Sequence, residues 1–255
     1  MTKPILELKK TLLHLSTKEL LTRPKFLKKL NLTINDGDFI TIVGSNGAGK
    51  STLFNVIGGN LPADSGELLL HGQNITNQNE EERTKFLSRV FQDPKLGTAP
   101  RMTVAENLLL AQKRGEKRRL KPRQLKQSME KFTKLAATMN NGLEERMNTA
   151  TGNLSGGQRQ ALSFLMATLK RPDVILLDEH TAALDPRTSQ ELLHATNQRI
   201  NEDHLTALMI THHLEAALKY GNRLVVLDDG QIKADFKGAE KEQLTMDQLY
   251  EYFEI

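Results

Sequence analysis

The chain has 255 residues, 38% of them hydrophobic, which is enough for one large domain or two closely joined ones around a sizeable core. It contains no cysteine, which excludes disulfides and thiolate metal sites, and it has no apolar stretch of about 18 residues and no signal-peptide pattern. We therefore expect a protein that neither spans a membrane nor is exported.

The net charge of +4 comes from one basic segment. Residues 113–123 contain seven basic residues and one acidic residue, whereas the rest of the chain has 28 basic and 30 acidic residues. Such a distribution does not predict a nucleic-acid partner. Two interpretations of the basic segment stay open: a solvated helix face or loop, or a contact with anionic headgroups at a cytoplasmic membrane surface.

The first 92 residues predict strands and turns. Asn35-Asp36-Gly37 predicts a hairpin turn between strands at residues 32–34 and 39–43. Leu68, Leu69 and Leu70 predict a further strand that ends at a turn formed by His71 and Gly72.

A glycine-rich loop follows the apolar strand at residues 39–43 and precedes residues 53–57, which can continue as a helix. This strand-loop-helix context predicts a phosphate loop whose glycines let backbone N–H groups surround phosphate oxygens. Lys50 is expected to reach the β- and γ-phosphates, and the Ser51 hydroxyl to bind Mg²⁺. The predicted nucleotide-binding residues are Gly44, Ser45, Asn46, Gly47, Ala48, Gly49, Lys50, Ser51 and Thr52.

Helical spacing dominates from about Pro94 to Lys170, as in Met129, Phe132 and Ala136, and no strand pattern appears there. Strand patterns return at residues 174–177, 205–210 and 224–227, and Thr245 has capping-box spacing for a closing helix. The sequence thus predicts an α/β fold with an inserted helical subdomain.

The strand at residues 174–177 ends at Asp178 and Glu179, at the carboxyl end where ligands bind in an open α/β sheet. Asp178 is the expected Mg²⁺ carboxylate of a phosphate-loop ATPase. Glu179 is the candidate general base that polarises the attacking water.

The motifs of the chain and the order in which they occur resemble those of the ATP-binding cassette family over almost the whole length of the chain. They match the Walker A, Q-loop, signature, Walker B, D-loop and switch-histidine motifs at Gly44 to Thr52, Gln92, Leu154 to Gln158, Asp178-Glu179, Ala182 to Asp185 and Thr211-His212. The pentapeptide Leu-Ser-Gly-Gly-Gln is the most specific of these.

The resemblance implies one ATPase domain over residues 1–255, with a mixed sheet, an N-terminal antiparallel β part, a core of residues 1–92 and 171–255, and a helical signature subdomain of residues 93–170. It implies ATP and Mg²⁺ as cofactors and a head-to-tail dimer, in which the signature of one subunit closes on the γ-phosphate held by the other. The implied roles are catalysis for Glu179, His212 and Gln92; nucleotide contact across the dimer for Ser155, Gly156, Gly157 and Gln158; a D-loop contact for Asp185; and metal binding for Ser51, Gln92 and Asp178.

Further expectations concern transport. The stretch from Asp178 to Pro186 resembles a bacterial subgroup that takes up amino acids or related small solutes with the help of a solute-binding protein. Docking on separate permease subunits through Gln92 and residues 93–102 would place the chain peripherally at the cytoplasmic face of the cell membrane.

Specific residues bear on other classes of protein. A soluble assembly ATPase, such as one serving iron–sulfur scaffolds, is the alternative, although the residues after Gln158 resemble transporter cassettes. A chromosome-organising ATPase would need long coiled-coil insertions, and a non-catalytic module would lack Glu179 or His212.

The chain departs from the family pattern at the adenine end of the site. No aromatic residue precedes Phe26, and His14 or Leu15 is near the place where the family has an aromatic platform. His213 stands where an aspartate is common, and for His213 and His180 structural packing is the expected role.

Overall fold

The computed structural model describes residues 3–13, 27–116 and 124–253. The chain forms two compact units, one of residues Met1–Arg83 and His204–Ile255 and one of residues Thr84–Asp203. The predicted adenine contacts at His14 and Leu15 lie outside the described residues, as do residues 117–123 of the basic segment. The predicted subdomain boundaries at residues 92 and 170 stay a prediction based on the motifs.

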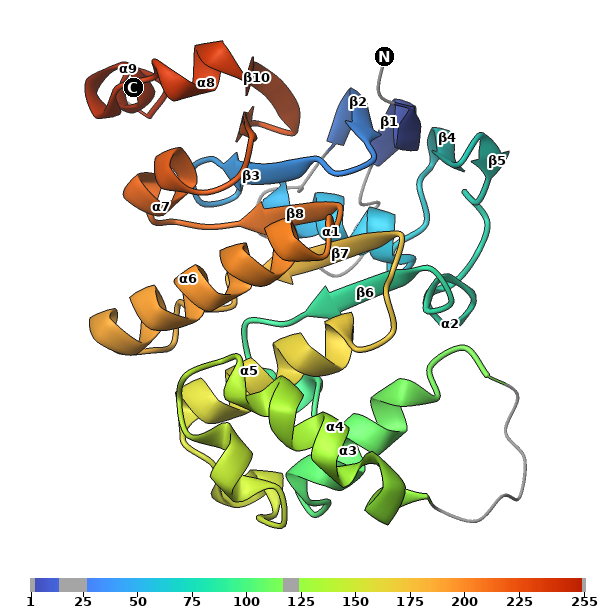
Figure 1. The fold of residues 1–255 in the computed structure, drawn as a ribbon. Helices are drawn as coiled ribbons and strands as arrows, with labels where there is room; N and C mark the ends of the chain where they lie inside the picture. Colours follow the sequence, from blue (N-terminus) through green and yellow to red (C-terminus); the bar gives the residue numbers. More distant parts are fainter. Residues whose placement is uncertain (1–2, 14–26, 117–123, 254–255) are drawn as a thin grey trace, which may run out of the picture. The chain divides into compact units, whose positions relative to one another are not determined.

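The first unit contains an antiparallel sheet with the strand order β2-β1-β4-β5 (Figure 1). The alternating burial of β2, with leucines and Ile34 buried and every other residue more exposed, is typical of a strand with one face on the core. The strands are β1 (Pro4–Leu13), β2 (Leu27–Asn35), β4 (Ser65–Leu70) and β5 (Gln73–Asn74).

A second group of strands in this unit has the order β10-β9-β3-β8, in which β8, β3 and β9 are parallel and β10 is antiparallel to β9. All five residues of β3 are buried, as expected for a central parallel strand. The strands are β3 (Phe39–Val43), β8 (Ala207–Ile210), β9 (Arg223–Asp228) and β10 (Gln231–Lys237).

The predicted hairpin around Asp36 and Gly37 is wrong. The turn exists, but β2 pairs with β1 in the antiparallel sheet, whereas β3 pairs with β8 and β9. Asp38 closes the turn by accepting a hydrogen bond from the Asn35 amide (2.9 Å), and its own amide donates to the Asn35 carbonyl (3.1 Å). Turn chemistry alone does not decide whether the flanking strands pair, and here they enter different sheets.

The helices of this unit include α1, which begins at the end of the glycine-rich loop. A buried arginine, Arg83, closes the carboxyl end of α1: its guanidinium donates to the carbonyls of Val56 (2.6 Å) and Ile57 (2.7 Å), and also to those of Ile75 and Thr76. The helices are α1 (Lys50–Gly58), α2 (Glu80–Arg83), α7 (Leu214–Lys219), α8 (Ala239–Glu242) and α9 (Met246–Tyr250).

Replacing Arg83 by methionine is expected to destabilise the protein by about 3 kcal/mol, because several buried carbonyl groups lose a charged donor at once. Urea unfolding followed by circular dichroism measures this change. The same substitution at the exposed Arg101 is the control and should shift the midpoint little. An equal stability of the two variants would contradict the structural role of Arg83.

The second unit contains the parallel strand pair β6 (Leu87–Val90) and β7 (Val174–Asp178) and a group of helices. Within the described part of residues 94–170 there are helices and no named strand, which confirms the prediction for this segment. Phe132 of α4 and Phe164 of α5 are completely buried among these helices. The helices of the second unit are α3 (Val104–Gln112), α4 (Leu125–Ala137), α5 (Gly156–Thr168), α6 (Pro186–Glu202) and the 3₁₀ turns η1 (Pro94–Leu96), η2 (Leu143–Arg146) and η3 (Thr151–Asn153).

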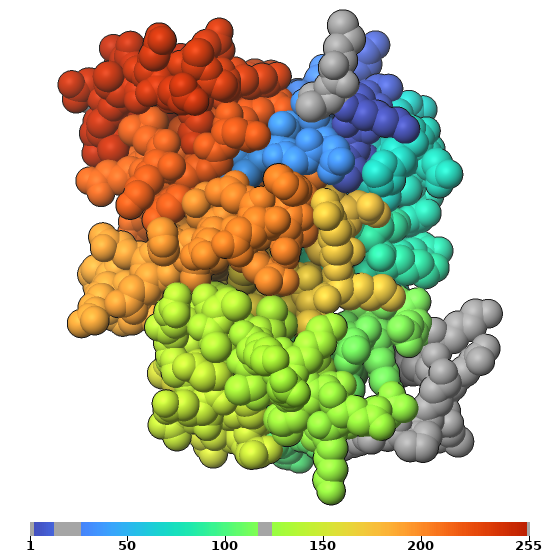
Figure 2. All heavy atoms as spheres, viewed as in Figure 1, coloured from blue at the N-terminus to red at the C-terminus, as the bar shows by residue number. Residues whose placement is uncertain are grey.

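The C-terminal segment packs on α7 and β9. Leu249 of α9 shares a buried cluster with Ala217 and Val226, and the surface of the segment, red in Figure 2, is continuous with that of the preceding elements. Lys241 anchors α8, because its buried ammonium group donates to the carbonyls of Tyr220 and Gly221. The predicted capping box of Thr245 is confirmed.

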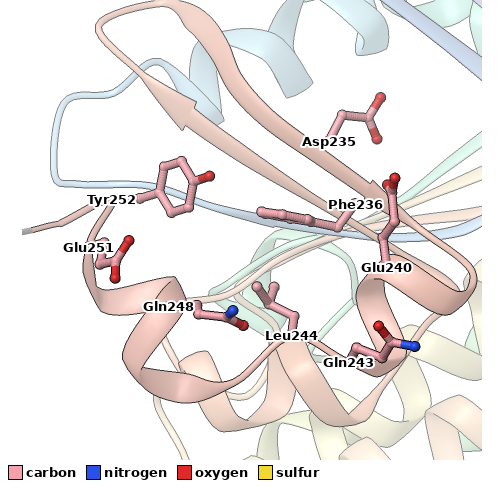
Figure 3. Close-up of a pocket in the computed structure, with 8 residues that line it drawn as sticks. All are labelled: Asp235, Phe236, Glu240, Gln243, Leu244, Gln248, Glu251 and Tyr252. Carbon is pink, nitrogen blue, oxygen red and sulfur yellow. The ribbon is translucent and has the colours of Figure 1, made fainter.

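A pocket of about 450 Å³ lies between β10, α8 and α9 (Figure 3). The rings of Phe236 and Tyr252 meet edge to face with their centroids 5.9 Å apart, and carboxylates surround them. None of the predicted site residues lines this pocket, so it is separate from the site described below.

Candidate active site

The glycine-rich loop joins the buried strand β3 to helix α1, as predicted. Gly44 is required for space, because a Cβ atom there would lie 2.1 Å from the carbonyl oxygen of Leu227 on β9. Gly47 and Gly49 are required for conformation, with φ angles of 88° and 102° that disfavour other residues. The loop therefore depends on its glycines for two different physical reasons.

Lys50 turns back over the loop that precedes it. Its ammonium group donates to the carbonyls of Gly44 (2.7 Å) and Ser45 (3.0 Å), and the residue is 5% exposed. Loop residues 45–47 and Ser51 are exposed. A buried cation thus lies beside an open loop and the amino end of a helix, an arrangement suited to a polyanion.

His212 lies at the same sheet edge as this loop. Ile42 of β3 pairs in parallel with Ile210 of β8, so Gly44 and His212 each follow a paired residue by two positions. The Thr211 amide donates to the Ile42 carbonyl (3.3 Å), and the His212 side chain is exposed. The structure therefore brings the predicted switch histidine and the start of the phosphate loop together, because both strands end at one edge.

The second unit holds Asp178 and Gln92 in a similar way. Val90 of β6 pairs with Leu177 of β7, so the residues that follow the two strands meet at one edge. Gln92 and Asp178 both line a cavity of about 560 Å³, whose walls also include residues 93–96 and Ala183. These two predicted metal residues are therefore neighbours.

Arg89 of β6 is the partner of Asp178 that the sequence analysis missed. Its guanidinium donates to Oδ2 of Asp178 at 2.5 Å, and both side chains are 13% exposed. A cation within a short apolar strand is the signal that could have revealed it, since such a charge needs a partner nearby.

Glu179 has a left-handed backbone conformation, with φ of 46° directly after β7. Such a conformation costs a non-glycine residue about 1–3 kcal/mol and is concentrated at functional sites. The amide of Ala182 donates to the Glu179 carbonyl (2.9 Å), which closes the turn. The turn lets consecutive carboxylates leave a strand whose side chains would otherwise alternate between faces.

The signature and D-loop residues stand at the amino ends of two helices. Ser155 caps α5 by accepting from the Gln158 amide (3.2 Å), and the Gln158 side chain returns to the Ser155 amide, so they form a capping box. Asp185 caps α6 by accepting from the Thr188 amide (3.1 Å), and hydrogen bonds from Thr188 lower the pKa of Asp185. Ser155, Gly156 and Asp185 remain exposed, whereas Gly157 is buried.

His180 is buried beside this site, which agrees with the packing role expected from the sequence. It is 2% exposed, and its Nε2 lies 3.4 Å from Oγ1 of Thr196 on α6. Burial lowers the pKa of His180 from 6.5 to about 4, since the charged imidazolium loses its hydration.

This pKa shift predicts a loss of stability in acid. In the unfolded chain His180 binds a proton near pH 6.5, whereas in the folded chain it does so only near pH 4. The free energy of unfolding is therefore highest above pH 6.5 and decreases by about 3 kcal/mol as the pH falls from 6.5 to 4. Urea unfolding between pH 7.5 and 4.5 measures the slope, which should flatten in His180→Gln. The same substitution at the exposed His194 on α6 is the control. An unchanged slope in His180→Gln would refute the assignment of the acid sensitivity to His180.

The oxygen donors of Ser51, Gln92 and Asp178 are the hard ligands that Mg²⁺ prefers. The Ser51 hydroxyl is exposed at the first turn of α1, and Gln92 and Asp178 line one cavity. By their chemistry, these oxygen donors therefore fit the Mg²⁺ expected from the sequence. Within the described ranges there is no group of three or more His, Cys, Asp or Glu residues that could hold a metal by itself.

Residues 27–182 match the family model described as ABC transporter. The chain belongs to the ABC transporter family. This cassette is 46% identical over 227 residues to the tyrosine transport ATP-binding protein of Clostridioides difficile strain R20291, and the match covers 89% of this chain and 90% of that protein. It is 34% identical to the spermidine/putrescine import ATP-binding protein PotA of Haemophilus ducreyi, covering 82% of this chain and 53% of that protein.

Solved ABC cassettes have the same fold. A dimeric cassette in a post-hydrolysis state with ADP and Pi matches with a TM-score of 0.76 and 27% identity, covering 91% of this chain and 98% of the other. A cassette in an ADP conformation matches with a TM-score of 0.76 and 29% identity over 100% of both chains. The α/β fold is confirmed, and the chain is an ABC ATP-binding subunit whose ATPase activity is coupled to transport.

Proposed function

We propose that this ABC subunit hydrolyses ATP to power the uptake of an amino acid, with tyrosine as the first solute to test, through separate permease subunits. The observation that carries the proposal is the 46% identity to a tyrosine transport ATP-binding protein over nearly the whole of both chains. Import also appears in the names of relatives with lower identity, for haemin, polyamines and phosphonates. These names favour transport over the alternative of a soluble iron–sulfur assembly ATPase.

In the proposed reaction, the loop from Gly44 to Thr52 holds the phosphates of ATP. Lys50 exchanges its carbonyl partners for β- and γ-phosphate oxygens, a stronger charge-assisted contact. Ser51, Gln92 and Asp178 would hold Mg²⁺, which would neutralise charge on the phosphates when bound.

Glu179 then accepts a proton from the attacking water. His212, exposed at the edge shared with the phosphate loop, contacts the γ-phosphate and orients the same water. The products are ADP and inorganic phosphate.

The proposed working form is a head-to-tail dimer. Ser155 and Gly156 are exposed at the amino end of the 13-residue helix α5, where backbone N–H groups favour an anion. A γ-phosphate held by a second copy is the proposed anion, with Gly157 and Gln158 completing the signature and Asp185 contacting the partner. A match to a dimeric cassette with ADP and Pi supports this arrangement.

Permease subunits are the proposed partners in the membrane. Within the described residues no helix is long and apolar enough to cross a membrane. The cavity beside Gln92 carries Leu96, whose 70% exposure is high for an apolar residue, and this wall is the proposed permease contact. The subunit would then lie at the cytoplasmic face of the cell membrane, in a system that also contains a solute-binding protein.

Affinity purification of the tagged chain from its own cells tests the proposal. We expect two permease subunits to co-purify, and membrane vesicles containing the complex to take up labelled tyrosine only with ATP. The Lys50→Ala subunit is the matched control for uptake. Recovery of soluble scaffold proteins without a permease would overturn transport, and uptake of a solute that is not an amino acid would overturn the amino-acid assignment alone.

A further inference from the structure

Arg89 links the Asp178 carboxylate to the wall of the neighbouring cavity. The guanidinium that donates to Asp178 also lies over the ring of Phe91, with Cζ 5.1 Å from the ring centroid. Phe91 begins the segment that leads to Gln92 and Leu96, and all of these residues line the same cavity.

The backbone of Phe91 is in turn hydrogen-bonded to the signature helix α5. Gln160 of α5 is 1% exposed, and its side-chain amide donates to the Phe91 carbonyl at 2.9 Å. A second close contact lies at η1, where a Cβ atom on Gly97 would be 2.7 Å from Oγ of Ser163 on α5. The cavity wall therefore packs against α5 at both ends of its short segment.

These contacts form one continuous chain from Asp178 through Arg89 and Phe91 to Gln160. We propose that Arg89 is a positioning residue that couples occupancy of the Asp178 carboxylate to the cavity wall at residues 91–96. This inference rests on the proposed role of Asp178 in holding Mg²⁺ with nucleotide.

The physical basis is competition for one carboxylate. Oδ2 of Asp178 accepts the hydrogen bond from Arg89 at a mostly buried site. A divalent cation at the same carboxylate therefore weakens the attraction between Asp178 and Arg89, because it offsets the negative charge of the carboxylate. Arg89 then gains from a closer approach to the electron-rich face of Phe91, over which its guanidinium already lies. A shift of Phe91 moves the segment that ends at the exposed Leu96.

Because the chain has no native cysteine, a fluorophore can be attached at one introduced cysteine to measure the movement of the cavity wall. Leu96→Cys, labelled with an environment-sensitive fluorophore, reports on the cavity wall in the otherwise wild-type subunit. The probe is AMP-PNP, added with Mg²⁺ or with EDTA, and the difference between the two emission changes is the Mg²⁺-dependent signal. Nucleotide affinity is measured on the same samples by titration calorimetry.

We expect Arg89→Met to lose the Mg²⁺-dependent signal while still binding Mg²⁺ and AMP-PNP, and Arg89→Lys to restore part of it. Phe91→Leu keeps the ion pair but removes the ring, so it should lose the signal too and serves as the second variant if Arg89→Met fails to fold. Lys95→Met removes an exposed cation from the same wall and should keep the signal.

A full Mg²⁺-dependent signal in folded Arg89→Met or in Phe91→Leu would overturn the inference, as would its absence from the labelled wild type. Failure of the labelled wild type to bind Mg²⁺ and AMP-PNP would instead overturn the proposed function, and the inference with it. Calorimetry distinguishes these failures, because only the second abolishes nucleotide binding.

Discussion

Replacing Glu179 by glutamine is expected to lower kcat for ATP hydrolysis by roughly 10²–10⁴-fold, because the amide keeps the shape of the side chain but cannot accept the proton of the attacking water. The left-handed backbone at Glu179 accommodates glutamine as well as glutamate, so the fold should be unaffected. Binding of ATP should persist, since the phosphate loop is unchanged. Phosphate release measures turnover, and equilibrium dialysis measures binding.

The control is Glu145→Gln, which changes an exposed carboxylate in the same unit and should leave turnover near the wild-type value. Retention by Glu179→Gln of more than about a tenth of wild-type turnover would show that another group is the general base.

A mixture of Lys50→Ala and Ser155→Arg subunits is expected to recover ATPase activity that neither variant has alone. In a head-to-tail dimer, each site takes its phosphate loop from one copy and its signature from the other. The mixed dimer therefore keeps one intact site. With random association and independent sites, activity should return to about a quarter of the wild-type value.

A double variant with both substitutions, mixed with Ser155→Arg subunits, is the matched control, because none of the dimers in that mixture has an intact site. Ser155 also caps α5, so thermal melts must show that Ser155→Arg is folded before mixing. Equal activities of the variant mixture and the separate variants would contradict the composite site.

The local parts of the candidate site were predictable because each depends on residues that are close together in the sequence. Glycine spacing after an apolar strand predicted the loop at Gly44, and the strand before Asp178 was predicted from its uninterrupted apolar run. The capping box at Thr245 was likewise predicted from residues three positions apart, and the structure shows a further one at Ser155.

Contacts between distant segments were not predictable in the same way. The turn at Asp36 was recognised, but the pairing of its flanking strands depends on partners far along the chain. The Arg89–Asp178 pair joins residues 89 positions apart, and Arg83 at the end of α2 joins the loop at Ile75 to the carboxyl end of α1. Burial and pairing of these cations result from tertiary packing, to which a short sequence window is insensitive.

The close approach of helices α5 and α6 has a mechanical consequence. A Cβ atom on Gly157 would lie 2.4 Å from Cγ2 of Thr188, and one on Gly156 would lie 3.3 Å from Leu184. Because there is so little space between them, we expect the amino ends of the two helices to move together. A pull on Ser155 by a neighbouring subunit of the proposed dimer would thus also displace Asp185 and the chain that leads back to Glu179, so closure of one proposed site would change the position of the proposed general base of the other.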